Sequence, residues 1–161
     1  MKHLISLLFL LFLTVLFGCE KDLVNETSNS ESDNIETESE EVELYSDTAI
    51  SVQQFKNQDF GDKYVWVAGY IVGSCSKSID NAIWEPPFEY DTAILLADEP
   101  EETDPEQVIA IKLQDETLKD QFSLMRNPEI YGAKVCFCGK QQKYLGIIGM
   151  KNSIIGYGWL N

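Results

Sequence analysis

Hydrophobic and polar residues alternate in several short stretches after residue 62. The longest, Lys63–Ser74, predicts a β-strand, because side chains two residues apart lie on the same face of a strand. One face carries Val65, Val67 and Ile71, and the other carries Trp66, Ala68 and Tyr70. Gly69 and Gly73 interrupt this strand, so we expect bends or bulges there.

Shorter apolar runs predict four more strands: Asp91–Ala97, Gln107–Leu113, Lys134–Gly139 and Tyr144–Met150. The tail Ser153–Leu160 can add another strand or cover a sheet edge. Apolar residues recur at helical spacing in Glu116–Met125, which predicts a helix that Asn127-Pro128 ends. A single helical turn is expected at Ser51–Phe55, with Ser51 as its cap. The segment Cys75–Tyr90 is expected to be a long loop.

Five strands with a helical element between the third and the fourth are the layout of an OB-fold, a partly open Greek-key barrel. A β-sandwich would need about seven strands, which this length barely supplies. We therefore predict a mainly β domain, a five-stranded OB-fold-like Greek-key barrel with one short helix, over residues 48–161.

Residues 1–18 form an apolar leader with a basic start at Lys2. Its apolar run, Leu4–Gly18, is interrupted only by Ser6 and Thr14. The run is shorter than the roughly 20 residues of a membrane-spanning helix, and it predicts a secretory signal peptide. The residues Leu16-Phe17-Gly18-Cys19 resemble a bacterial lipobox. That resemblance implies cleavage before Cys19 and lipidation of Cys19, which would anchor the protein to a membrane surface. The alternative is an ordinary secretory signal with an incidental cysteine.

Residues 19–47 comprise the lipidated cysteine and an acidic linker. From Glu20 to Asp47 there are eleven acidic residues and one basic residue, Lys21. Aromatic residues are nearly absent, so this segment cannot bury enough apolar surface to fold, and we predict a disordered spacer. Glu20-Lys21-Asp22 resembles the charged export tags of surface lipoproteins in the Bacteroidota.

Five blocks follow one another in the folded part: VWVAGYIVGS (65–74), DTAILLADEPEETD (91–104), VIAIKL (108–113), NPEIYGAKV (127–135) and KYLGIIGMKN (143–152). As a set they resemble a family of uncharacterised OB-fold domains in exported lipoproteins of the Bacteroidota. This resemblance implies the fold and a location in the cell envelope, lipid-anchored to the outer membrane. It leaves open whether the domain faces the periplasm or the cell surface, and it implies no activity.

Catalytic chemistry has few candidate residues in this chain. The single histidine, His3, lies in the leader, so a mature protein would have no Ser-His-Asp triad and no histidine metal ligand. We therefore expect no enzyme and no cofactor. Cys136 and Cys138 share a strand face and could join Cys75 as soft-metal ligands, but buried core cysteines or one disulfide are favoured. The acidic turn at 98–104 could bind calcium, and a solvated turn without metal is favoured.

Aromatic residues give the strongest indication of a ligand site. OB-folds bind oligosaccharides and oligonucleotides on one face and its flanking loops, where rings can stack on either ligand. We expect the ligand-binding residues to be Trp66, Tyr70, Trp84, Phe88, Tyr144 and Lys143. The alternative is that several of these rings only pack the barrel.

Charge helps to separate the possible ligands. Sixteen acidic and ten basic residues from Thr48 to Asn161 make the domain acidic, whereas nucleic-acid binding depends on a basic patch. The leading hypothesis is a non-catalytic binding domain for a carbohydrate or an envelope protein partner. A single-stranded nucleic-acid binder and a structural accessory subunit of an envelope complex are the alternatives.

Overall fold

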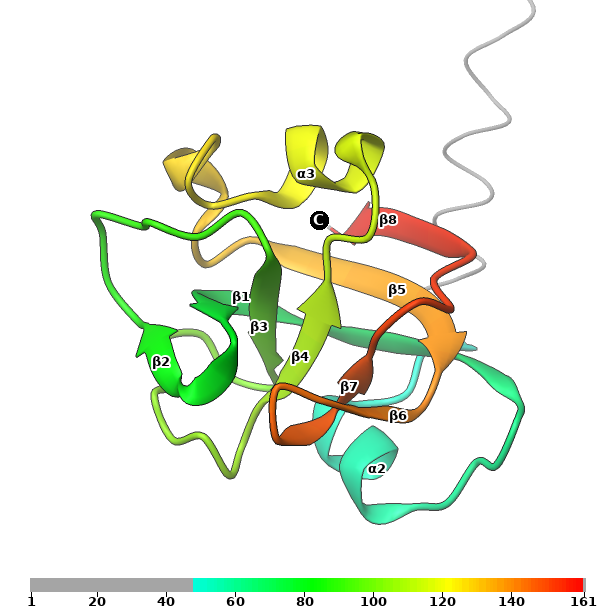
Figure 1. The fold of residues 1–161 in the computed structure, drawn as a ribbon. Coiled ribbons are helices and arrows are strands. Elements are labelled where there is room, and N and C mark those ends of the chain that lie inside the picture. Colours follow the sequence, from blue (N-terminus) through cyan, green and yellow to red (C-terminus); the bar gives the residue numbers. More distant parts are fainter. Residues whose placement is uncertain (1–47, 161) are drawn as a thin grey trace, which may run out of the picture. The chain divides into compact units, whose positions relative to one another are not determined.

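A computed structural model describes residues 48–160, and Figure 1 shows their arrangement. The leader, Cys19 and the whole acidic segment up to Asp47 lie outside the described residues. Eight strands pair in one sheet: β1 (Tyr64–Ser76), β2 (Ser78–Ile83), β3 (Ala93–Ala97), β4 (Ile109–Lys112), β5 (Lys134–Lys140), β6 (Gln142–Tyr144), β7 (Ile147–Met150) and β8 (Gly156–Leu160).

Seven strands follow one another in the order β6-β7-β4-β3-β1-β5-β8, and β2 is attached to β1 alone. All the pairings are antiparallel except that of β4 with β7, which is parallel. Strands β6 and β8 end this order and do not pair with each other, so the sheet is not a closed barrel. The fold class is therefore mainly β, as predicted, but a five-stranded OB-fold is not confirmed.

Three of the eight strands account for the difference. Strand β2 lies in the predicted long loop, and β8 is the extra strand predicted for the tail. The predicted fifth strand, Tyr144–Met150, is divided, because Tyr144 ends β6, Leu145 and Gly146 form a turn, and β7 begins at Ile147. Strands β2 and β6 have only six and three residues, and polar residues occupy three positions of SIDNAI and two of QKY. Their pairing comes from neighbours in space, because such short segments carry little periodic signal.

The long strand β1 pairs with three other strands. Its first half, from Tyr64 to Tyr70, pairs with β5, its second half pairs with β3, and β2 pairs with its last residues, Ser74–Ser76. The register shifts between Ile71 and Gly73, which confirms the predicted irregularity. A Cβ atom added to Gly73 would lie 2.7 Å from the carbonyl oxygen of Ile83, so this close approach of two strands requires glycine.

Two short helices lie at opposite ends of the sheet in Figure 1. Helix α2 (Val52–Asn57) begins with the predicted cap, Ser51, whose side chain accepts from the Gln54 amide in a capping box. Helix α3 (Glu116–Phe122) is capped by Asp115 and ends before Met125, which is 45% exposed. A 3-10 turn, η1 (Pro128–Ile130), then leads to β5.

Apolar side chains are buried on both faces of the sheet. The main core fills one face and is closed by the two helices; its largest members include Phe55, Ile71, Phe122 and Phe137. A second cluster occupies the other face, where β2 lies over β3 and β4; it comprises Val72, Cys75, Ala93, Leu95, Ala97, Val108, Ala110 and Tyr144. Burial of both faces follows from the continuous apolar sequence of β3, AILLA.

Candidate functional site

The six predicted ligand-binding residues do not form one exposed surface. Phe88 is buried in the main core, with its ring centroid 5.6 Å from that of Tyr131. Tyr144 is buried in the second cluster, and burial raises the pKa of its hydroxyl. Of the six, only Lys143 is exposed.

Strands β2 and β8 explain why the remaining predicted rings are partly covered. Tyr70 and Trp84 are half-buried against the second cluster, on the face that β2 covers. The Ile79 amide of β2 donates to the carbonyl of Leu145 at 2.8 Å, which closes this cover against the β6–β7 turn. Trp66 is also half-buried, and its ring lies over Gly156 of β8. Ligand binding by these residues stays a prediction.

Three other large rings are exposed among residues 48–160: Tyr64 of β1, and two that share one strand, β8. Tyr157 and Trp159 have 36% and 38% of their surface exposed. The Trp159 ring stacks on buried Phe122, with centroids 4.9 Å apart and planes 25° apart. Tyr157 meets the same phenylalanine edge-on at 5.2 Å, and the Gln121 side chain donates to its hydroxyl at 3.1 Å. We call Tyr157, Trp159 and Gln121 the β8 platform.

The strand sequence explains this arrangement. Alternation in Gly156–Leu160 puts both rings on one face of β8, opposite Phe137 and Val135 of β5. Gly156 points to the other face, where an added Cβ would lie 2.8 Å from the Trp66 ring. The alternation Gly-Tyr-Gly-Trp in the sequence indicates two rings on one face of this strand. The expectation for the tail named only an extra strand or the cover of a sheet edge.

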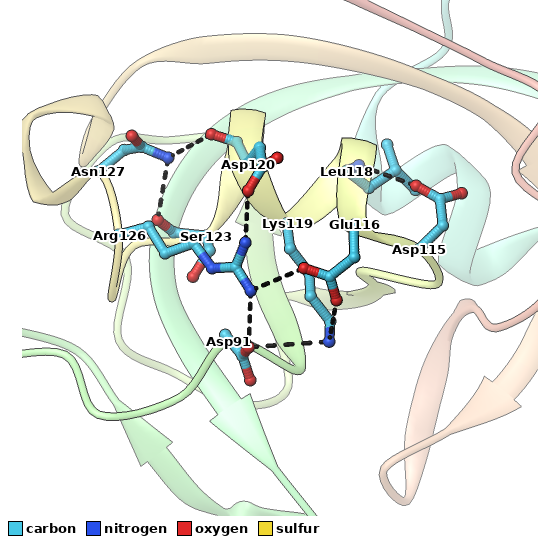
Figure 2. Close-up of polar contacts among 9 residues, drawn as sticks. All are labelled: Asp91, Asp115, Glu116, Leu118, Lys119, Asp120, Ser123, Arg126 and Asn127. Atoms are coloured by element: carbon cyan, nitrogen blue, oxygen red, sulfur yellow. Dashed lines mark hydrogen bonds and ion pairs between the residues drawn. The ribbon is translucent and has the colours of Figure 1, made fainter.

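An ion-pair network fixes α3, the helix that supplies Phe122 and Gln121 (Figure 2). Arg126 contacts Glu116 at 3.0 Å and Asp91 at 3.3 Å, and it also pairs with Asp120. Lys119 pairs with Glu116 at 3.0 Å and with Asp91 at 3.7 Å. Because Asp91 precedes β3, the network joins the helix to the sheet.

Proton-transfer chemistry is not favoured around α3. Hydrogen bonds from Lys119 and then Arg126 lower the pKa of Glu116, so this carboxylate is ionised at neutral pH and cannot serve as a general acid. The arrangement offers two ring surfaces with an amide and carboxylates nearby. Such groups can stack on a flat ligand and accept or donate hydrogen bonds.

The three described cysteines are buried and free, and none forms a disulfide. This confirms the interpretation of Cys75, Cys136 and Cys138 as core residues. Burial raises the pKa of the Cys75 and Cys136 thiols to about 11, so both are protonated and weakly nucleophilic at neutral pH.

Residues 48–160 contain neither a metal-binding cluster nor a membrane-spanning helix. No group of three or more His, Cys, Asp or Glu side chains within this range could hold a metal ion. In the same range, no helix has the length and apolar character needed to cross a bilayer.

Asp98 of the acidic turn has a structural role, because its carboxylate accepts from the Val52 and Gln53 amides at the start of α2.

Known proteins similar to this chain come from three comparisons. Residues 50–159 match the family described as "Domain of unknown function (DUF6359)". The chain belongs to this family. It is also 31% identical over 103 residues to "Endonuclease YhcR" of Bacillus subtilis (strain 168). This match covers 64% of the chain but only 8% of that protein.

A solved structure, that of the hypothetical protein ygiW from E. coli, matches at 14% identity with a TM-score of 0.39. It covers 70% of this chain and 89% of ygiW, a likeness too distant to transfer a function. The match to the DUF6359 family confirms the prediction of a domain of unknown function. The expected kinship with lipoproteins of the Bacteroidota stays a prediction.

Proposed function

We propose that this DUF6359 domain is a non-catalytic binding domain for carbohydrate, with the β8 platform as its binding surface. The main observation in support is that partly exposed Trp159 stacks on buried Phe122. One face of the indole is held by the core, and more than a third of the residue stays accessible. A ring fixed in this way loses little side-chain entropy when a ligand stacks on it.

The polar groups beside the rings support a sugar as the ligand. Gln121 and the Tyr157 hydroxyl are already hydrogen-bonded to each other, and each keeps further donor or acceptor capacity for a sugar hydroxyl. The net acidic charge of the domain suits a neutral glycan better than a nucleic acid, because a long chain of phosphates would be repelled.

Glycan binding by the purified chain tests this proposal. A panel of polysaccharide fragments is screened by thermal shift, since a ligand that binds only the folded state raises the melting temperature. Trp159→Ala is expected to abolish the shift, and Trp159→Phe to retain part of it.

Tyr64→Ala is the matched control. Tyr64 is 49% exposed and is not part of the β8 platform. The Lys140 ammonium lies over its ring, 5.2 Å from the ring centroid. Loss of the Tyr64 ring is expected to leave glycan binding unchanged. Equal loss in the Tyr64 and Trp159 variants would contradict a specific role for the platform.

A single-stranded nucleic-acid binder is the second candidate function. The observation that favours it is the similarity to part of a protein named as an endonuclease. In that case an oligonucleotide, not a glycan, stabilises the chain, and the effect falls steeply with salt. If neither ligand raises the melting temperature of the chain, the proposed function becomes binding of an envelope protein partner or an accessory role in an envelope complex.

We also propose that the chain is a lipoprotein anchored through Cys19 in the outer membrane, with an elaborated, open form of the OB-fold as its domain. The two-sided pairing of β1 and the parallel pairing of β4 with β7 support the fold relationship. Metabolic labelling with a radioactive fatty acid tests the anchor: label is expected in the membrane fraction and is lost in Cys19→Ala. Label that survives this substitution would refute the site.

A further inference from the structure

A second feature lies at the other end of the sheet, near α2. An open hollow of about 670 Å³ is bounded by α2, the loop before β4 and the β6–β7 hairpin. Its size is within the range of small-molecule sites, about 300–1,000 Å³. Its chief lining residues are Lys56, Ile79, Glu106, Lys143, Ile147 and Ile148. We call it the α2 hollow.

Hydrogen bonds hold the first wall of the hollow in place. The carboxylate of Asp98 accepts from the Val52 amide at 2.6 Å and from the Gln53 amide at 2.9 Å. The Gln53 side chain donates to that of Gln107 at 2.8 Å. At the far end of the helix, Gln141 donates to the carbonyl of Gln58 at 2.9 Å. Helix α2 is thus tied to both neighbouring loops.

The opposite wall is equally constrained. Leu145 and Gly146 form a two-residue turn between β6 and β7, with φ values of 54° and 95°. Both positive angles are typical of the tight hairpin turns that follow the twist of a sheet. The carbonyl of Leu145 accepts from the Ile79 amide of β2 at 2.8 Å. A ligand would therefore meet a largely preformed site.

Charge and apolar surface are both present in this hollow. Lys56 is half-buried and donates to the backbone carbonyl of Glu106. Lys143 is exposed and has no ion-pair partner among residues 48–160. Between them the surface is apolar, with half-buried isoleucines of β2 and β7. Burial is the main cause that lowers the pKa of Lys56, and an anion nearby would relieve that cost.

We infer that the α2 hollow binds a phosphate monoester whose ester group is an aromatic ring or another apolar ring. The phosphate carries close to two negative charges at neutral pH and can pair with both lysines, whereas a carboxylate carries one. Lysine is a common point-charge partner for phosphate. The ring would lie on the isoleucine surface, which gains from apolar burial.

Glu106 at the rim gives the inference a distinctive consequence. Its carboxylate and that of Asp104 both lie close enough to Lys56 to raise the pKa of that lysine, against the larger effect of burial. Both carboxylates must repel a bound phosphate, and Glu106 is the one that lines the hollow itself. Removing its charge should therefore strengthen binding, which a merely structural role for Glu106 would not predict.

Calorimetric titration of the purified full chain with phenyl phosphate tests the site. Saturable binding is expected, and Lys143→Ala should weaken it by about tenfold, the effect of one lost charged contact. Glu106→Gln should strengthen it severalfold. Lys151→Ala is the matched control, because that exposed lysine is not among the residues lining the hollow, and it should leave binding unchanged.

Two further ligands identify what is recognised. Benzoate should bind more weakly than phenyl phosphate, and inorganic phosphate should also bind more weakly because it lacks the ring. Absence of phenyl phosphate binding would overturn the inference, as would equal loss in the Lys143 and Lys151 variants. Binding only to vesicles of phosphatidylglycerol would also overturn it and assign the lysines to a membrane surface. Glycan binding at the β8 platform is measured separately, so either proposal can fail alone.

Discussion

The rings beside β2 and the rings on β8 have similar chemistry but opposite surroundings. Tyr144 is buried and Trp84 half-buried because β2 folds back over the outer face of the sheet. Trp159 and Tyr157 lie on a strand at the edge of the sheet and keep more than a third of their surface exposed. An aromatic residue therefore becomes a candidate platform only where no second element covers it.

The largest effect is expected from Phe122→Ala, which removes the support of the β8 platform. This ring is fully buried and contacts Phe137, Tyr157 and Trp159. Loss of a buried phenylalanine typically lowers the free energy of unfolding by about 3–5 kcal/mol. Urea denaturation measures this change, and glycan binding should fall with it. An unchanged unfolding free energy would show that the ring is not part of the core.

Gly73→Val should loosen the packing of β2 against β1 and should lower the free energy of unfolding by less than Phe122→Ala does. The new Cβ would lie 2.7 Å from the Ile83 carbonyl and 3.2 Å from the Trp84 ring. Overpacking of this kind costs about 1–3 kcal/mol. Thiol labelling of the folded protein should then increase at Cys75 in the second cluster but not at Cys136. Equal labelling of both would indicate general unfolding and would remove the distinction between the two regions.

Alkaline pH should destabilise both regions through their thiols. Burial raises the pKa of Cys75 and Cys136 from 9.0 to about 11 in the folded chain. The folded state therefore keeps protons that the unfolded state loses, so the stabilisation is complete below pH 9 and is lost as pH rises through about 11. Urea midpoints between pH 8 and 11 measure it, and Cys75→Ala with Cys136→Ala should flatten the decline. An equally steep decline in the double variant would point to other groups.

The smallest effect is expected from Arg126→Met in the network around α3. Two of its three partners, Glu116 and Asp120, are exposed to solvent, and the third, Asp91, is partly buried. Ion pairs at the surface contribute little to stability. The melting temperature should fall slightly at low salt and less at high salt.

The pH dependence of this variant gives the sharper test. Because the pKa of Glu116 is lowered in the folded state, the stabilisation is present above the pKa of an unfolded glutamate and is lost as pH falls through the folded value. The difference between the Arg126 variant and the native chain should therefore shrink in acid. A difference that persists at low pH would assign Arg126 a packing role.

Local sequence determined much of the framework. The periodicity of β1, the apolar runs of β3, β4 and β5 and the capping box at Ser51 predicted these elements close to their observed bounds. These signals are local, because they depend on side-chain alternation or on hydrogen bonds within four residues. The cysteines were also predicted to be core residues from their type and their strand positions.

Tertiary structure alone decided which rings are accessible. Nothing within SIDNAI indicates that Ser78–Ile83 pairs with β1 and covers Tyr144. Nothing within ETLKDQF indicates that Phe122 supports Trp159, 37 residues later. The α2 hollow likewise joins Lys56 and Lys143 from distant segments. Such sites depend on strand pairing across long stretches of chain, which the pattern within any one segment does not specify.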